Sequence, residues 1–162
     1  MTVLAPGLLL LALLAGGGAI AQERRNWFDD PFWQASADVP DCPTPAGPLL
    51  TQEEQRREAH DRIERGTSCW LAGRCADSNI YRGDRALGER VRAALDGSAR
   101  LTGSSVWVTV QRQWVFLQGC VASPQQALAI EADVKAIDGV QAVVTTLDVG
   151  PGRPPTYRRL ER

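Results

Sequence analysis

Apolar residues follow regular repeats in the second half of the chain. From Asp84 they recur at helical spacing, which predicts a short amphipathic helix that ends near Gly97. The apolar positions of this helix are Leu87, Val91, Ala94 and Leu95. Strict alternation then predicts two strands with a turn at Gln111, Arg112 and Gln113. Their aliphatic positions are Val106, Val108 and Val110 on the first strand, and Val115, Leu117, Gly119 and Val121 on the second.

A second helix and a last strand complete this half. Ser123 is a suitable N-cap, Pro124 a suitable first residue and Gln126 a suitable N3 residue, so we expect a helix to begin there and to close at Gly139. Its inward side chains are Ala127, Ile130, Val134 and Ile137. Residues 143–149 alternate again before Pro151 ends the fold. The order helix, strand, strand, helix, strand predicts an α+β domain with a three-stranded sheet and two helices on one face.

The first half of the chain is less regular. Residues 26–48 are aromatic at first and then proline-rich, which argues against regular structure. Thr51 and Glu54 form a capping box, and acidic and basic residues alternate at i,i+4 beyond it, which predicts a helix over about 51–65. Gly66 is its expected C-cap.

The first 21 residues have the pattern of a secretory signal peptide. They contain no charged side chain and run from a leucine-rich core to Ala19-Ile20-Ala21, an A-x-A cleavage pattern. The apolar run is far shorter than the roughly 20 residues that span a bilayer. We therefore expect cleavage after Ala21, a mature chain that begins at Gln22 without a transmembrane segment, and a periplasmic location that can be peripheral to a membrane.

Overall charge excludes one class of partner. The chain carries 18 basic and 19 acidic residues, a formal net charge of -1, which disfavours a nucleic-acid binder steered by bulk positive charge. The hydrophobic fraction of 44% and charged fraction of 23% are ordinary for a globular domain.

Four cysteines in an exported chain favour disulfides. Cys42, Cys69, Cys75 and Cys120 would enter an oxidising compartment, where an even number favours bridges. The spacing of Cys69 and Cys75 is too wide for a zinc knuckle, so no metal is expected. Three pairings are possible, and the sequence does not choose among them. The pairing with the shortest loop joins Cys69 to Cys75 and leaves Cys42 for Cys120.

Residues 84–149 resemble the BON domain of bacterial cell-envelope proteins. The resemblance is carried by the helix that ends in Ala93-Ala94-Leu95, the strands VWVTV and WVFLQGCVAS, the helix start Ser123-Pro124, and the final IDGVQAV and LDV. It implies an envelope-associated module without catalysis or cofactor, in a family linked to phospholipid surfaces, envelope integrity and osmotic stress. No lipid-contact residue is carried over from the family.

No residue pattern points to catalysis. His60 lies in a charged helix with Glu64 four residues later, which is typical of a solvated or ion-paired histidine. Asp29 and Asp30 precede Pro31 and are best interpreted as a solvated turn. The sequence lacks nucleophile-elbow, zinc-protease and phosphate-loop motifs.

The strand register predicts an aromatic sheet face. If the aliphatic positions meet the helices, Trp107, Trp114 and Phe116 point to the opposite face, together with Cys120. A patch of this kind is rarely left in water, so we expect a cover. The extension, a protein partner or lipid headgroups could supply it. The extension is favoured because Cys120 needs an upstream partner, and its candidate aromatics are Trp27, Phe28, Phe32, Trp33 and Trp70.

The last thirteen residues form a basic tail with three prolines. We expect it to be flexible and able to reach an anionic surface, or else to be only a solubilising terminus. Its candidate lipid-binding residues are Arg153, Tyr157, Arg158, Arg159 and Arg162.

Four segments follow from these patterns: a signal peptide (1–21), an extension with one helix and a cysteine loop (22–83), a BON-like domain (84–149) and a basic tail (150–162). The sequence predicts an exported, non-catalytic envelope module that binds anionic phospholipid and supports envelope integrity or stress tolerance. The alternative is a structural or assembly subunit that binds another envelope protein through the aromatic face or the extension.

Overall fold

Three α-helices and a four-stranded sheet make up the fold. The computed structural model describes residues 22–73, 75 and 77–161, so the predicted signal peptide and Arg162 lie outside it. The elements are β1 (Phe32–Ala37), α1 (Gln52–Leu71), α2 (Asp84–Leu95), a 3-10 turn (Ala99–Leu101), β2 (Ser105–Gln111), β3 (Trp114–Val121), α3 (Pro124–Lys135) and β4 (Ala142–Val149). The sheet order is β1-β2-β3-β4, with β4 parallel to β3 and the other pairs antiparallel. The α+β class is confirmed.

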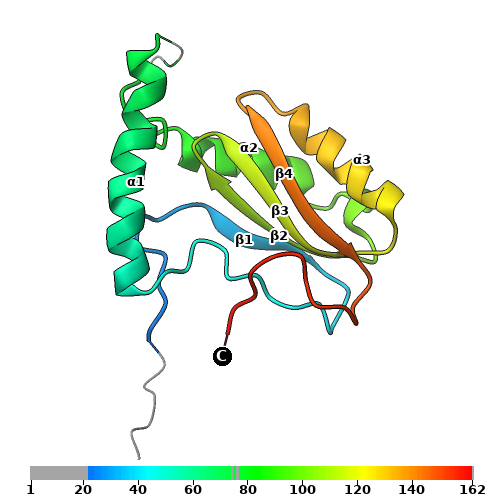
Figure 1. Ribbon diagram of the computed structural model, residues 1–162. Helices are drawn as coiled ribbons and strands as arrows, with labels where there is room; N and C mark the ends of the chain where they lie inside the picture. The colour runs from blue at the N-terminus through cyan, green and yellow to red at the C-terminus, as the bar shows by residue number, and fades with distance from the viewer. Residues whose placement is uncertain (1–21, 74, 76, 162) are drawn as a thin grey trace, which may run out of the picture.

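The main core lies between the sheet and two helices. Helices α2 and α3 cover one face of the sheet, while α1 stands apart beside it (Figure 1). The alternating aliphatic positions of β2 and β3 meet the apolar stripes of α2 and α3, as the periodicity predicts. The buried members are Leu87, Val91, Leu95, Leu101, Val106, Val108, Val110, Val115, Leu117, Val121, Ile130 and Val134.

The strand count predicted from the sequence is wrong, because the extension supplies a fourth strand. β1 pairs with β2, and the backbone N–H of Val110 also donates to the carbonyl of Pro31 at 3.0 Å. Trp33 and Ala35 point to the helix side and pack on the main core. Proline residues flank β1 but none lies within it, so the backbone of this segment can pair with β2.

The β2–β3 hairpin turns at Arg112 and Gln113, as predicted. Both residues have left-handed backbones, with φ of 50° and 63°, which is typical of a type I′ turn that usually contains glycine. Their N–H groups donate to the buried carboxylate of Asp84, at 2.6 and 2.8 Å. Burial is the main cause that raises the pKa of Asp84, although these two hydrogen bonds act to lower it. The first residue of α2 thus holds a strained turn in place.

Helix α1 continues beyond its predicted end. Its start has the predicted capping box, with Thr51 and Glu54 bonded reciprocally. Gly66 does not end the helix; it is a buried interior residue whose backbone lies near Asn79. The helix ends only at Leu71, so Cys69 belongs to its last turn rather than to a loop.

Candidate binding surfaces

The predicted aromatic face is covered by the protein itself. Trp107 is buried in a second cluster with Cys42, Cys120, Phe32 and Val39. Residues 39–50 and the C-terminal tail run across this face, opposite the two helices (Figure 1). Trp107 therefore lies where the extension docks on the sheet, as the favoured prediction has it, and is not open to a separate partner.

Trp114 and Phe116 are only partly buried on the same face. The guanidinium of Arg112 lies 4.1 Å from the centre of the Trp114 ring. Phe116 lines a small cavity of about 210 Å³ that the extension closes with Gly47, Pro48 and Leu50. Neither aromatic ring is presented as an open surface patch.

The extension covers this face with fewer aromatics than expected. Phe32 packs on Trp107, but Trp33 lies on the helix side of the sheet, where Arg92 stacks on it at 4.7 Å. Trp27 is partly exposed and donates its indole N–H to the carbonyl of Leu50 at 2.7 Å. Trp70 is half exposed near the end of α1. Period-two alternation places Phe32 and Trp33 on opposite faces once they belong to a strand.

Two disulfides link the cysteines in the pairing with the shortest loop. Cys42 bonds to Cys120 across the covered face, with Cα atoms 5.8 Å apart, and joins the extension to β3. Cys69 bonds to Cys75 and closes a loop at the end of α1. The first bond spans 78 residues and the second only 6.

Residues 157–160 of the tail are bonded to residues 43–46 of the extension, whereas the sequence-based expectation was a free terminus. The backbone N–H of Ala46 donates to Arg158, and that of Leu160 donates to Thr44, both at 2.8 Å. The Tyr157 hydroxyl donates to the Pro43 carbonyl at 2.6 Å. Only 6% of Tyr157 is exposed, so it is not available at headgroup level. Burial, followed by the nearby Asp148 charge, raises its pKa to about 12.

A basic cluster forms where the tail meets the start of the described chain. Glu54 of α1 accepts from Arg24 at 2.6 Å and from Arg158 at 2.9 Å. The Thr51 N–H bond, together with these two arginines, lowers the pKa of Glu54 despite its partial burial. Arg25 lies beside the partly exposed Trp27, and Arg159 is exposed next to Arg158. Arg153 is also exposed, further up the tail. No local pattern in the sequence indicates that Arg24 and Arg158 share Glu54.

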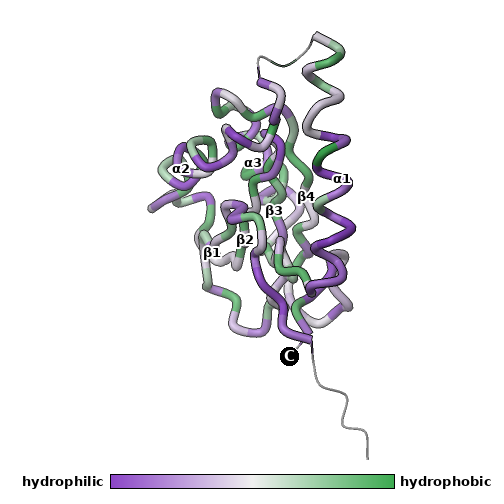
Figure 2. Tube along the Cα trace, turned by 90° about the vertical axis from the view of Figure 1, so that its left-hand side faces the viewer, coloured by the Kyte–Doolittle hydropathy of each residue, from purple (hydrophilic) through white to green (hydrophobic). Residues whose placement is uncertain are grey.

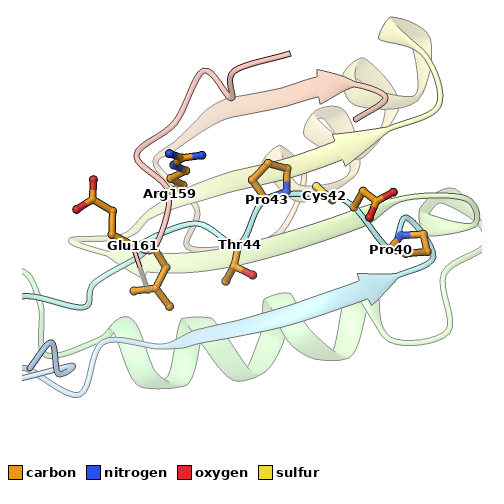
Figure 3. Close-up of a pocket in the computed structure, with 8 residues that line it drawn as sticks. Pro40, Cys42, Pro43, Thr44, Arg159 and Glu161 are labelled. Carbon is orange, nitrogen blue, oxygen red and sulfur yellow. The ribbon is translucent and has the colours of Figure 1, made fainter. Parts of the chain in front are cut away.

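A pocket of about 580 Å³ lies beside this cluster, between the tail and residues 40–44 (Figure 3). Arg159 and Glu161 stand on the tail side, and Pro40, Cys42, Pro43 and Thr44 lie on the other (Figure 3). Asp41 and Leu160 complete the lining, which contains no histidine or lysine.

A buried ion pair holds α1 against the sheet. Arg62 donates with two nitrogens to the carboxylate of Asp30, and Gln111 donates to the same group at 2.6 Å. The rings of Phe28 and Tyr81 sandwich the guanidinium at 4.0 and 4.4 Å. Burial raises the pKa of Tyr81. The prediction of a solvated turn at Asp30 is therefore wrong, since this carboxylate is buried.

The far half of α1 exposes apolar side chains. Its first half is mainly hydrophilic, and hydrophobic positions appear toward its C-terminal end (Figure 2). Ile63 and Leu71 are largely exposed, and Trp70 is half exposed. Ile63 also borders a pocket of about 630 Å³ with Phe28 and Tyr81. This side of the extension is a possible contact surface that no partner covers among the described residues.

The remaining candidate chemistry is sparse. His60 is exposed and lies 3.4 Å from Glu64. Within residues 22–73, 75 and 77–161, no group of three or more His, Cys, Asp or Glu side chains is arranged to hold a metal ion. In the same part of the chain, no helix is both long and apolar enough to cross a membrane.

Comparison with known proteins agrees with this architecture of a small α+β module. The family model described as the BON domain matches residues 83–151, which confirms the resemblance of this segment to the family. The match is consistent with an envelope-associated binding module. The domain and the two disulfides also fit an exported protein. No curated protein matches the chain.

Gly119 gives the resemblance a physical basis at one position. Its φ is 138°, which side chains rarely adopt. A Cβ atom there would lie 2.0 Å from the carbonyl oxygen of Ser105 on β2. The strand can pass β2 closely only because this residue is glycine.

Proposed function

We propose that the protein is an exported envelope module that attaches weakly to anionic phospholipid through its basic cluster, in support of envelope integrity or stress tolerance. The carrying observation is the pair of contacts from Glu54 to Arg24 and Arg158, which brings the tail next to the first residues that the structure describes. Exposed Arg159 and half-exposed Trp27 lie at the same end, and tryptophan with arginine is typical of interfacial surfaces.

The proposed attachment is weak because much of the cluster is already paired. Arg24 and Arg158 share Glu54, and Arg25 pairs with Glu23 at 2.9 Å. Each arginine near an anionic surface contributes on the order of 1 kcal/mol. A few such contacts give reversible binding that salt should screen.

Vesicle flotation tests this proposal. Oxidised protein comprising residues 22–162 should float with phosphatidylglycerol vesicles at low salt, but not with phosphatidylcholine vesicles. Arg159→Gln should weaken binding about fivefold, the equivalent of about 1 kcal/mol. Arg85→Gln is the matched control, because Arg85 is an exposed arginine on α2 outside the cluster. Absence of binding to anionic vesicles at low salt would exclude the lipid proposal.

A second candidate is a subunit that binds another envelope protein through the extension. The exposed Ile63, Trp70 and Leu71 on α1 favour it, whereas the covered aromatic face does not. Substituting Ile63 and Leu71 with serine should abolish retention of that partner and leave vesicle binding unchanged. Removal of residues 1–21 stays a prediction for both candidates, and the intact mass of protein from the periplasm tests it.

A further inference from the structure

The outer edge of the sheet at β4 carries unused backbone hydrogen-bonding groups. β4 pairs only with β3 among the described residues. The N–H of Gly150 donates to Val121 on β3 at 3.0 Å. Because alternate residues of a strand direct their backbone groups to the same side, even-numbered residues of β4 face β3. Val143, Thr145 and Leu147 therefore direct their N–H and C=O groups outward.

The two edges of the sheet differ in protection. β1 has six residues, a register shift between Gln34 and Ser36, and Pro31 directly before it. β4 has eight residues in unbroken register and contains no proline or lysine. Its one charged residue, Asp148, lies near its end. Bulges, prolines, lysines and short strands normally block edge-to-edge pairing, and β4 has none of them.

Exposed apolar side chains flank this open edge. Thr145 donates its hydroxyl to the Glu131 carboxylate of α3 at 2.9 Å, which places that side of α3 over β4. Leu128 lies one turn before Glu131 on the same side of the helix and is 66% exposed. Val149, at the end of β4, is 54% exposed. Both side chains would lose water contact if another strand and helix lay alongside.

We propose that a second copy of this chain pairs its β4 antiparallel with this β4, about a two-fold axis next to Thr145, and continues the sheet to eight strands. A two-fold axis brings identical edges together, so one exposed edge on each copy is sufficient. The middle of the strand is uncharged. The two Asp148 carboxylates lie about 20 Å apart at opposite ends of the paired strands, so like charges do not oppose each other.

Sedimentation of oxidised protein comprising residues 22–162 tests the proposal. The molecular mass is measured without lipid at protein concentrations from about 1 μM to 1 mM, where a dimer with a modest interface should dissociate. The wild type should pass from monomer to dimer. Thr145→Pro removes one outward N–H, and proline is tolerated at strand edges where the N–H faces solvent. It should weaken the dimer at least tenfold. Thr145→Val is the matched control, because it loses the bond to Glu131 but keeps the N–H, and it should dimerise like the wild type.

Leu128→Arg provides an independent variant. Leu128 is exposed, so the substitution leaves the fold intact even if the proline variant unfolds, and it should also weaken the dimer at least tenfold. A wild type that stays monomeric throughout would overturn the proposal. A dimer that Thr145→Pro and Leu128→Arg leave unchanged would show that another surface pairs, which also overturns it. Because lipid is absent, neither result depends on vesicle binding.

Discussion

The two disulfides have very different positions. Cys42–Cys120 crosses the covered face of the sheet, and both residues are buried. Cys69–Cys75 lies at the exposed end of α1 and closes a loop of a few residues. One bond fixes the extension to the BON domain over a separation of 78 residues, and the other changes only a local loop. The long disulfide therefore holds the two parts of the chain together, whereas the short disulfide closes a loop at the end of one helix.

Paired substitution of each disulfide should give the largest effect. In the chain-entropy treatment, the long bond stabilises by about 4.5 kcal/mol and the short bond by about 2 kcal/mol. The variant with both Cys42→Ser and Cys120→Ser should therefore lose about twice the free energy of unfolding that the Cys69→Ser, Cys75→Ser variant loses. Urea denaturation of both variants measures this. Equal losses would mean that the extension is held mainly by other contacts.

The Asp30–Arg62 pair should be the main contact that attaches α1 to the sheet, and its loss should cost more stability than loss of the short disulfide. Arg62→Ala leaves the Asp30 carboxylate buried with only Gln111 as a described side-chain partner, which should cost about 3 kcal/mol. Arg56→Ala, at an exposed position of the same helix, is the control and should change little. Thermal unfolding and amide exchange along α1 report the result. If the thermal midpoint of Arg62→Ala is unchanged, other contacts hold α1 in place.

The tail over the long disulfide should respond to alkaline pH. Tyr157 has a folded-state pKa of about 12, above its ordinary value of 10.0. The contribution of Tyr157 to the free energy of unfolding is fully present below pH 10 and is lost as the pH rises toward 12. In this range the Tyr157 hydroxyl ionises in the unfolded chain but not in the folded one. The loss should reach about 2 kcal/mol. Tyr157→Phe should remove this part of the dependence, which denaturation at pH 8 to 11.5 can measure. Parallel pH curves for the two proteins would contradict it.

Sequence patterns predicted the BON core well because its elements depend on local signals. The hairpin at Arg112 and Gln113, the Ser123 cap and the aliphatic alternation of β2 and β3 all follow from residues that are neighbours in the chain. For the long disulfide, the strand register predicted only that Cys120 needs an upstream partner on the face that required a cover, and Cys42 was the partner left by the pairing with the shortest loop.

The extension and the tail were harder to predict because their structure depends on distant contacts. β1 forms on the edge that β2 offers, and Asp30 is buried because Arg62 lies 32 residues later. Tyr157 is held by Pro43, 114 residues earlier. A proline-rich tail with four arginines is typical of a free terminus, and nothing within its thirteen residues indicates that it bonds to residues 44–46.

The long disulfide also has a consequence for the order in which the protein can mature. A chain made from its N-terminus presents Cys69 and Cys75 to Cys42 before Cys120 has been synthesised. The nearest oxidation partners of Cys42 are therefore the wrong ones, and the native bond can form only after β3 has emerged. Any early bridge that uses Cys42 has to be reopened by thiol exchange, which is slow without an isomerase. Biogenesis of this protein should therefore depend on disulfide isomerisation as well as on oxidation.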